Sequence, residues 1–339
     1  MLPFAGPAVP GRCEPLYLNA DEVRRILTPD LVFDVVEQTL QSLAVGRVVN
    51  GSKGSLSLDD SDGRRFMGAI SGAVLDQTVM GVKWFATCDD NASRGLPRVP
   101  ATILVCDSLT GSLQGIVEAT SLTAMRTAAL AAVSVKYCRA AQTGKAAIIG
   151  FGAIGKAVAH FLATTTNVTS IAVSGRNLGK TIADCAMVGQ SLDIPVVAAA
   201  SVQSAVQDAD IIVTASGLTE DAPFLCGHWV KPGVTVCALS SYQEIDGVLV
   251  DRADRVFVDN WDACQHRGNL APFVRAGRIS RRDIVCEIAD VAAGRQQGRV
   301  SPEEIVLIVL IGLGALDIAL AAQALHVAWQ RGLGQPLRQ

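Results

Sequence analysis

The sequence predicts an α/β fold in which a doubly wound parallel sheet is combined with a second, α+β domain. From Thr120 to Val258, strand-like and helix-like segments alternate, and strands separated by helices of this length form parallel sheets with helices on both faces. Before Thr120, a helical segment is followed by consecutive strand-like runs, which is typical of a mixed domain with antiparallel strands. These two patterns predict the fold class and divide the chain.

The composition is that of a globular protein with a large core. The chain has 339 residues, of which half are hydrophobic and 18% are charged, and this length suggests two domains. A formal net charge of -3 argues against a nucleic-acid-binding protein. The nine cysteines include no C-x-x-C pair and the histidines have no metal-ligand spacing, so we expect neither a metal site nor a disulfide framework. The N-terminus lacks the features of an export signal, so we expect a cytoplasmic protein.

The first 120 residues predict helices and an antiparallel sheet. Residues 19–22 offer a helix start, and from 22 to 43 the apolar residues recur every three or four positions, which places one stripe against a core. A Thr-Gly pair between two apolar runs predicts a hairpin turn at residues 107–111. The expected strands cover residues 54–58, 79–86 and 101–107.

The alternating segments predict the doubly wound domain. Its expected helices cover residues 121–138, 154–164, 180–191 and 201–207. Its expected strands cover residues 145–149, 170–174, 196–198, 211–214, 234–239 and 255–258. We place the boundaries so that residues 126–304 form this domain, and residues 1–125 with 305–339 form the other one.

A long apolar run near the C-terminus has two interpretations. Residues 305–325 are apolar for about 20 positions, the length that a membrane-spanning helix needs. Asp317 lies inside the run, however, and Gly312 and Gly314 interrupt its first half. A buried strand over 305–311, a glycine turn and a core helix over 315–329 therefore explain the run better than a membrane span does.

Residues 146–155, AAIIGFGAIG, contain three glycines with the spacing G-x-G-x-x-G. The motif follows a predicted apolar strand and opens a predicted helix, which is the context of a Rossmann-type dinucleotide-binding turn. In that geometry the pyrophosphate lies on free N–H groups at the helix start, where the helix dipole favours negative charge. The alternative is a glycine turn with a purely structural role. The predicted cofactor contacts are Gly150, Gly152, Ala153, Ile154 and Gly155.

The end of the second predicted parallel strand bears on the choice of cofactor. An NAD-binding turn usually carries an acidic residue about 20 positions after the glycines, where it holds the ribose hydroxyls. Here the sequence reads AVSGRN, and Gly175 occupies that position. Without a carboxylate there, Ser174 and Arg176 could bind a 2′-phosphate, so NADP(H) is favoured over NAD(H). The alternative is that Arg176 is a solvated loop cation.

Two cations occur in segments that are otherwise apolar. Lys83 lies in the predicted strand MGVKWFAT and Arg126 in the predicted helix SLTAMRTAALAAVSV. Burying a lone cation is costly unless an anion meets it, so this pair predicts a site for a carboxylate substrate. The alternative partner of Arg126 is an internal carboxylate, either Glu118 or Asp317.

Five segments together resemble a known family. They are GVKW, DDNASRGLPRVPATILVCDSLTG, EATSLTAMRTAA, GFGAIG and GLGALDIA, in that order. The chain resembles the ornithine cyclodeaminase and mu-crystallin superfamily from about Leu16 to Gln323. The most specific part of the resemblance is the T-A-x-R-T-A-A helix, followed some twenty residues later by the glycine motif. The resemblance implies an NAD(P)-dependent enzyme that acts on an amino acid or an imino acid.

The resemblance also implies roles for residues of the first domain. Lys83 and Arg126 match residues that bind the carboxylate of the amino acid, and Met67 is assigned to the same substrate site. Lys53 stands near a third cation, which is usually arginine in the family. Because a lysine lacks the planar fork of arginine, its presence implies a different pose of the substrate. For proton transfer the candidates are Lys83, with a pKa lowered by burial next to Arg126, and Asp317, which matches the acid of the last helix.

Further matches concern the cofactor. Thr127 matches a contact with the cofactor phosphate, and Arg126 beside it is also assigned to the cofactor. Ala215 and Ser216, in VTASG, match the edge of the nicotinamide pocket, to which Ser240 is also assigned.

Two local stretches favour one branch of the superfamily. WFATCDDNASRGLPR and VFVDNWDACQHRGNL are similar to the N-(2-amino-2-carboxyethyl)-L-glutamate dehydrogenases, which make 2,3-diaminopropionate for siderophores and peptide antibiotics. Such an enzyme removes a hydride from the α-carbon of the glutamate moiety, and water then splits the imine into 2-oxoglutarate and the diamino acid. The cyclodeaminases carry their general base in the stretch G-x-D-x-P-G-K-x-E-L. This chain has the shorter CALSSYQEID without that Asp, which argues against ornithine cyclisation.

Several alternatives stay open at the level of sequence. The first is an NADPH-dependent reductase of cyclic or open-chain imines, such as pyrroline or piperideine carboxylates or iminosuccinate. Less favoured are an ornithine cyclodeaminase and a binding protein for a small acidic ligand. For any of them the resemblance implies a homodimer that pairs the sheets of the first domains. Apolar strands with few charges, such as ATILVCD, are consistent with a covered edge.

Overall fold

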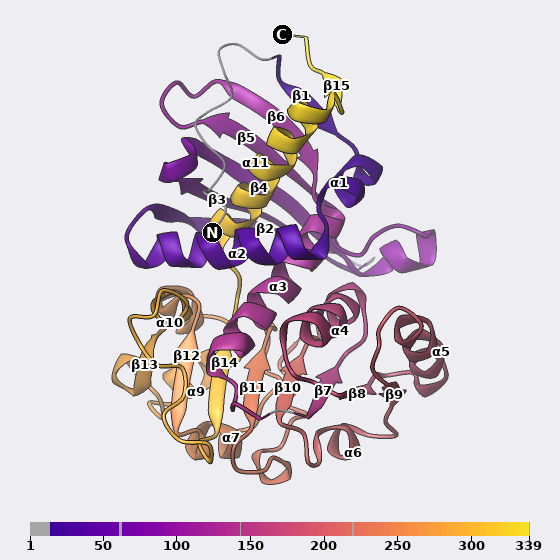
Figure 1. Cartoon of the computed structure of the whole chain (residues 1–339), viewed down its shortest axis with the longest axis vertical. Helices are drawn as coiled ribbons and strands as arrows, with labels where there is room; N and C mark the ends of the chain where they lie inside the picture. The colour runs from indigo at the N-terminus through magenta and orange to yellow at the C-terminus, as the bar shows by residue number, and fades with distance from the viewer. Residues whose placement is uncertain (1–13, 61–62, 143, 219, 339) are drawn as a thin grey trace. The chain divides into compact units, whose positions relative to one another are not determined.

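The computed structural model describes residues 14–60, 63–142, 144–218 and 220–338. The chain divides into two compact units, which are described separately below (Figure 1). The first unit is discontinuous and comprises Met1–Arg126 with Leu313–Gln339. The second unit, Thr127–Gly312, is inserted between these two segments of the chain.

The first unit is built on a seven-stranded mixed sheet with the order β15-β1-β6-β5-β4-β3-β2. Neighbouring strands are antiparallel except for β1 and β6, which are parallel. The predicted hairpin turn at residues 107–111 joins β5 to β6, and Asp107 Oδ1 accepts hydrogen bonds from the amides of Leu109 and Thr110. The strands are β1 (Leu16–Leu18), β2 (Val48–Asp60), β3 (Gly63–Val74), β4 (Val79–Cys88), β5 (Ala101–Asp107), β6 (Leu113–Glu118) and β15 (Gln335–Pro336).

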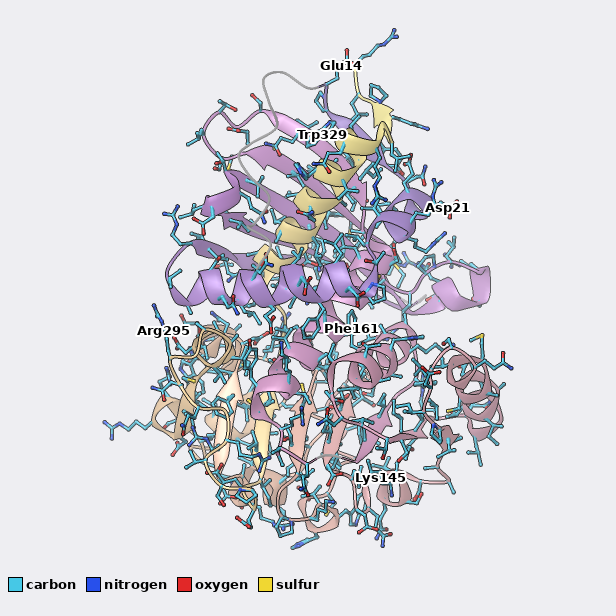
Figure 2. The ribbon with its side chains drawn as sticks, viewed as in Figure 1. Glu14, Asp21, Lys145, Phe161, Arg295 and Trp329 are labelled. Carbon is cyan, nitrogen blue, oxygen red and sulfur yellow. The ribbon has the colours of Figure 1, made fainter. Side chains whose placement is uncertain are left out.

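Helices cover one face of this sheet. α11 (Gly314–Arg331) packs on β3 and β4 and on the amphipathic helix α2 (Pro29–Ala44), while α1 (Ala20–Ile26) also contacts α11. The close approach of α11 needs a strand residue without a side chain, since a Cβ at Gly72 would lie 2.6 Å from the Ala315 nitrogen. Figure 2 shows Trp329 on the last turns of α11, within the side chains of this unit. A short 3-10 turn over Leu75–Gln77 follows β3, and another over Asp89–Arg94 follows β4.

The opposite face of the sheet carries large apolar side chains that are exposed. Along β5 buried residues alternate with exposed ones, as expected for a strand with one covered face, and on β4 the exposed Met80 and Trp84 each follow a buried residue. Trp84 is 48% exposed and Leu104 on the neighbouring strand is 40% exposed. The other exposed large apolar side chains on β2 and β4 are Val49, Leu56, Leu58 and Met80.

The second unit contains an eight-stranded sheet with the order β13-β12-β14-β11-β10-β7-β8-β9, in which every neighbouring pair is parallel. The order reverses between β7 and β10, which is where ligands bind in doubly wound sheets. The strands are β7 (Lys145–Ile149), β8 (Ser170–Ser174), β9 (Val196–Ala198), β10 (Ile211–Thr214), β11 (Thr235–Ala238), β12 (Arg255–Val258), β13 (Ile284–Glu287) and β14 (Val306–Val309).

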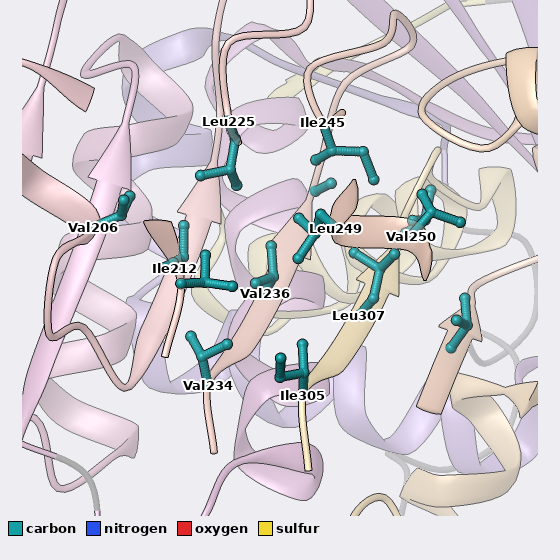
Figure 3. Packing of buried hydrophobic residues seen from close by; sticks show 14 of the residues in the cluster. Val206, Ile212, Leu225, Val234, Val236, Ile245, Leu249, Val250, Ile305 and Leu307 are labelled. Carbon is teal, nitrogen blue, oxygen red and sulfur yellow. The ribbon is translucent and has the colours of Figure 1, made fainter. Parts of the chain in front are cut away.

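Helices and short turns complete the second unit. Most of α3 (Thr120–Cys138) belongs to it, although this helix begins in the first unit. The remaining helices are α4 (Ala153–Thr165), α5 (Leu178–Gly189), α6 (Val202–Val206), α7 (Gly247–Arg252), α8 (Trp261–Cys264), α9 (Ala271–Arg275) and α10 (Ile288–Ala292), with 3-10 turns at Gly227–Trp229 and Arg281–Asp283. The central strands are buried on both faces, and Figure 3 shows Ile212, Val236 and Leu307 of three adjacent strands packed in one cluster.

The α/β fold class predicted from the sequence is confirmed. The apolar run near the C-terminus forms the strand β14 and the helix α11, separated by residues 310–313. The predicted boundary after residue 304 would place β14 in the first unit, whereas β14 pairs with β11 and β12 in the second. Within the described residues, no helix has both the length and the apolarity required to cross a membrane.

Candidate functional site

Lys83 lies in the middle of β4, on the face of the sheet that the helices cover. It pairs with Ile70 of β3 on one side and with Ile103 of β5 on the other. Only 2% of the residue is exposed. The apolar strand pattern MGVKWFAT places the ammonium group in this position, where a charge needs compensation.

A single carboxylate compensates two buried cations, Lys83 and Arg126. Asp317 Oδ2 accepts a hydrogen bond from Lys83 Nζ at 2.8 Å, and Asp317 Oδ1 accepts one from Arg126 Nε at 2.9 Å. Asp317 is fully buried in the first turn of α11, where the helix dipole also favours a negative charge. Of the two internal partners considered for Arg126, the structure therefore shows Asp317. Glu118 instead accepts a hydrogen bond from the Thr120 amide.

The charges of this cluster do not cancel. Two cations and one carboxylate give a net charge of +1 when Lys83 is protonated, so the cluster can still bind an anion. Burial lowers the pKa of Lys83, and the positive charge of Arg126 lowers it further. The ion pair with Asp317 acts in the opposite direction, and the resulting pKa is about 8. Lys83 can therefore gain or lose a proton near neutral pH.

Lys53 lies in the same cross-strand row as Lys83. Residue Ile70 of β3 pairs with Lys53 on one side and with Lys83 on the other. The Nζ atom of Lys53 lies 4.4 Å from the centroid of the Phe66 ring and 4.9 Å from that of Phe85. Lys83 Nζ lies 5.5 Å from the same Phe85 ring, so one aromatic ring contacts both ammonium groups.

Met67 is the sequence-predicted substrate residue that the structure does not bring together with these cations. It is separated from Ile70 by three positions along β3, and side chains alternate between the two faces of a strand. Met67 therefore faces the side of the sheet opposite to Lys53 and Lys83. Phe66 takes the place next to Lys53, and the sequence reasoning missed both Phe66 and Phe85.

The glycine motif of the second unit forms a tight strand-to-helix turn. It follows β7 and leads into α4, whose N-cap is Gly152. Gly150 has φ +94°, and a Cβ there would lie 2.5 Å from the Ala215 carbonyl oxygen. A Cβ at Gly155 would collide with the Gly150 carbonyl oxygen. Nothing lies within 4 Å of a Cβ at Gly152, which leaves the start of α4 open to an approaching phosphate group.

Ala215 and Ser216 follow β10 and lie against this turn. A Cβ at Gly150 would also lie 2.8 Å from the Ser216 Cα atom, so the two loops are in contact. Ser216 is held by Glu244, a fully buried residue that the sequence reasoning did not identify. The sequence offers one hint of Glu244: it is an acidic residue within CALSSYQEID, the stretch that lacks the general base of the cyclodeaminases.

The turn after β8 carries the residues predicted to select the cofactor. Ser174 is buried at the end of the strand, whereas Arg176 is exposed. A Cβ at Gly175, the position where NAD-binding turns carry a carboxylate, would collide with the Thr181 hydroxyl oxygen, so a larger residue there would require the Thr181 side chain to move. Asn177 caps α5 by accepting a hydrogen bond from the Lys180 amide.

The remaining predicted residues lie on α3, at the start of α4 and after β11. Ala153 and Ile154 form the first turn of α4, and Thr127 follows Arg126 on α3. Ser240 is buried after β11, and its hydroxyl accepts a hydrogen bond from the Tyr242 amide. Within the described parts of the chain, no group of three or more His, Cys, Asp or Glu side chains is arranged to hold a metal ion.

Known proteins share this architecture over nearly the whole chain. A sequence model of the Ornithine cyclodeaminase/mu-crystallin family matches residues 14–331. A Delta(1)-pyrroline-2-carboxylate reductase of Bacillus cereus is 24% identical over 325 residues, which cover 94% of this chain and 98% of that protein. The N-((2S)-2-amino-2-carboxyethyl)-L-glutamate dehydrogenase of Staphylococcus aureus is 24% identical over 337 residues, which cover 96% of this chain and 98% of that protein.

A similar fold is found among solved structures. The Delta(1)-pyrroline-2-carboxylate reductase of Thermococcus litoralis, solved in complex with NADH and L-proline, superposes with a TM-score of 0.89. The two chains are 24% identical, and the match covers 95% of this chain and 100% of the other.

Proposed function

The chain belongs to the ornithine cyclodeaminase/mu-crystallin family and is an NAD(P)-dependent oxidoreductase of that family, and from this premise we propose its substrate. We propose that it oxidises N-(2-amino-2-carboxyethyl)-L-glutamate at the C–N bond of the glutamate moiety. A hydride and a proton leave the H–C–N–H unit and give an imine. Water then adds to the imine carbon, and the C–N bond breaks to release 2-oxoglutarate and 2,3-diaminopropionate.

The positive cluster on the covered face of the first sheet carries this proposal. Lys83 and Arg126 share one carboxylate, so the buried set keeps a net positive charge that suits an α-carboxylate. Lys53 lies two strands away in the same row, and adjacent strands are about 4.8 Å apart. The resulting spacing of roughly 10 Å between the two lysine backbones suits a substrate that carries more than one carboxylate. The named dehydrogenase of Staphylococcus aureus is a relative whose substrate has this property.

The residues of the cluster divide the work of binding and proton transfer. Arg126 and Lys83 would hold the α-carboxylate and so orient the α-C–H bond, and such positioning lowers the barrier by fixing the reacting atoms at about 3 to 3.5 Å. Lys83 has a pKa of about 8, which suits a group that accepts the amine proton at Nζ. Asp317 keeps Lys83 in place by accepting its hydrogen bond.

The glycine turn of the second unit fits a nicotinamide dinucleotide. Side chains at Gly150 or Gly155 would collide with neighbouring backbone, and the open position at Gly152 lets a phosphate reach the first amides of α4. The reaction needs a hydride acceptor, which a nicotinamide cofactor held by this turn would supply. We propose NADP(H) as the preferred form, because Gly175 carries no carboxylate that would repel a 2′-phosphate and Arg176 is exposed beside it.

A second candidate is the reduction of a cyclic imine such as a pyrroline carboxylate. It is favoured by the names of the Bacillus cereus and Thermococcus litoralis relatives. The same cluster would serve it, since a protonated Lys83 can donate the proton that the imine nitrogen needs. For either reaction we propose a homodimer that covers the exposed apolar face of the first sheet.

An absorbance assay with both forms of the cofactor distinguishes the two candidates. The purified protein is mixed with NAD⁺ or NADP⁺ and the glutamate conjugate, and in parallel with NADH or NADPH and a panel of cyclic and open-chain imines. The proposed reaction is supported if the conjugate causes an increase in the absorbance of NADH or NADPH and if 2-oxoglutarate is released. An inert conjugate together with rapid reduction of a pyrroline carboxylate would establish the second candidate instead.

A further inference from the structure

Glu244 is a fully buried carboxylate to which the proposed chemistry gives no role. It follows β11 in the second unit, and it is 0% exposed. Its Oε1 atom accepts hydrogen bonds from the Ser216 amide, at 3.1 Å, and from the Ser216 hydroxyl. Its Oε2 atom accepts one from the Thr214 hydroxyl. Three donors therefore surround one acidic group at the carboxyl end of β10.

The backbone of Glu244 is fixed as firmly as its side chain. Its amide and the amide of Ile245 both donate to Asn269 Oδ1, at 2.7 and 3.2 Å. Ile245 is fully buried and pairs with Leu225, and Figure 3 shows both side chains in the core cluster. The position of the carboxylate is therefore set by the core of the unit rather than by solvent.

Ser216 connects this buried carboxylate to the glycine turn. The segment Ala215–Ser216 lies so close to Gly150 that a Cβ on that glycine would meet Ser216 Cα at 2.8 Å. Glu244 thus fixes the loop that forms one side of the turn after β7. A carboxylate at this place also brings a negative charge to the carboxyl end of β10, next to the point where the strand order reverses.

We propose that Glu244 is a positioning residue for the nicotinamide end of the cofactor site, and that its negative charge favours binding of the oxidised over the reduced cofactor. This inference rests on the proposed function and on the family resemblance, which implies that Ala215 and Ser216 form the edge of the nicotinamide pocket. The oxidised ring carries a positive charge and the reduced ring does not, so a fixed carboxylate nearby attracts only the oxidised form. Burial raises the pKa of Glu244 above its ordinary value, and the hydrogen bonds from Ser216 and Thr214 offset part of this rise.

The variant Glu244→Gln separates charge from shape. Glutamine keeps an oxygen that accepts from Ser216, and its amide group can donate to the Thr214 hydroxyl, which accepts as well as donates. The positioning of Ser216 is thereby retained while the charge is lost. Glu287→Gln is the matched control, because Glu287 is a second carboxylate with a raised pKa that accepts a backbone hydrogen bond, from the Trp261 amide, although Glu287 is only partly buried.

The test compares dissociation constants of NADP⁺ and NADPH, measured by calorimetry at a neutral and at an alkaline pH, because a raised pKa of Glu244 makes the preference for NADP⁺ increase with pH. We expect Glu244→Gln to weaken binding of NADP⁺ about fivefold or more and to change binding of NADPH less than about twofold. Glu287→Gln should leave the ratio of the two constants unchanged. A second variant, Ser216→Ala, should weaken both forms of the cofactor, because it removes a hydrogen bond that fixes the loop.

The outcomes distinguish this inference from the proposed function. If the unmodified protein binds both forms and Glu244→Gln leaves their ratio unchanged, the role of Glu244 is overturned and the proposed function stands. If the unmodified protein binds neither form, the proposed function itself fails. Circular dichroism of each variant shows whether it is folded, and a misfolded Glu244→Gln would be replaced by Thr214→Val with Glu244 intact. In that variant the unchanged charge should preserve the preference for NADP⁺, and loss of the preference would overturn the inference.

Discussion

Asp317 Oδ2 lies 2.8 Å from Lys83 Nζ, although 234 positions separate the two residues in the chain. The contact joins the middle of β4 to the first turn of α11, and Arg126 Nε completes it at 2.9 Å. Three charged groups in an apolar interior are costly as a structural device, since a well-packed apolar core of equal volume is often as stable. Their presence together is therefore best explained by the carboxylate that they are proposed to bind.

Removal of the shared carboxylate should destabilise the protein. Asp317→Asn leaves Lys83 and Arg126 as buried cations without a counterion, and breaking a buried ion pair in this way costs about 3–5 kcal/mol. The free energy of unfolding from urea denaturation measures the change. Asp251→Asn is the control, because the Asp251–Arg278 pair is exposed and is worth about 1 kcal/mol or less. If both variants lose the same free energy of unfolding, the buried cluster contributes no more to stability than an exposed ion pair does.

The direction of catalysis should determine the sign of the pH dependence. With a pKa of about 8, Lys83 accepts a proton only when neutral, so kcat/KM for amine oxidation should rise as the pH increases through about 8. Imine reduction needs the protonated form of Lys83, so kcat/KM for this direction should fall over the same pH range. Lys83→Arg keeps the charge but stays protonated throughout, so both inflections should vanish. Inflections that persist in this variant would assign the proton transfer to another group.

The turn after β8 should decide the choice between the two cofactors. Arg176→Ala is expected to raise KM for NADP⁺ about tenfold or more and to leave KM for NAD⁺ nearly unchanged, because a hydrogen bond to a charged phosphate is lost only in the first case. Steady-state kinetics with both cofactors gives the ratio. Arg282→Ala, an exposed arginine in the turn Arg281–Asp283, is the matched control. A parallel rise for NAD⁺ would indicate that Arg176 does not read the 2′-phosphate.

The apolar face of the first sheet should control association. Trp84→Glu or Leu104→Glu places a charge among exposed apolar side chains, and either variant should convert a dimer into a monomer in sedimentation velocity. Leu109→Glu provides the control, since Leu109 is 84% exposed but lies in the turn between β5 and β6. A monomeric unmodified protein, or a dimer that tolerates both charges, would contradict the proposed interface.

In the second unit, local patterns in the sequence predicted the strands β7 to β12 and β14, but not β13 or the short helices α7 to α10. Its strands are short, apolar and separated by helices, and the glycine motif lies where the strand pattern of β7 gives way to the helical pattern of α4. The strand β3 was missed in the first unit. Its glycines weaken the strand signal, yet Gly72 admits α11, and Gly68 makes room for Phe85, whose ring would lie 2.5 Å from a Cβ there. The feature that hides β3 in the sequence is therefore required by its packing.

In the candidate site, too, local sequence patterns predicted some features, whereas others depend on packing between distant parts of the chain. Lys83 and Arg126 stand out because they interrupt apolar segments, and a local pattern suffices to find them. Their common partner is set by how α11 packs on β3 and β4, which depends on contacts between distant parts of the chain, so the sequence left Glu118 and Asp317 as open alternatives. The burial of Glu244 was even harder to predict from the sequence, because it follows from the packing of Ile245 and Asn269 around this residue.

The insertion of Thr127–Gly312 into the first unit has a consequence for biosynthesis. A ribosome delivers the complete second unit before it delivers α11, so the inserted unit can fold while the earlier one still waits for its final helix. During that interval the nascent sheet lacks its cover, and Lys83 and Arg126 lack their counterion. Maturation of the proposed amino-acid site is thus a late event, and the apolar surface that α11 covers stays open to solvent or to chaperones until α11 has left the ribosome.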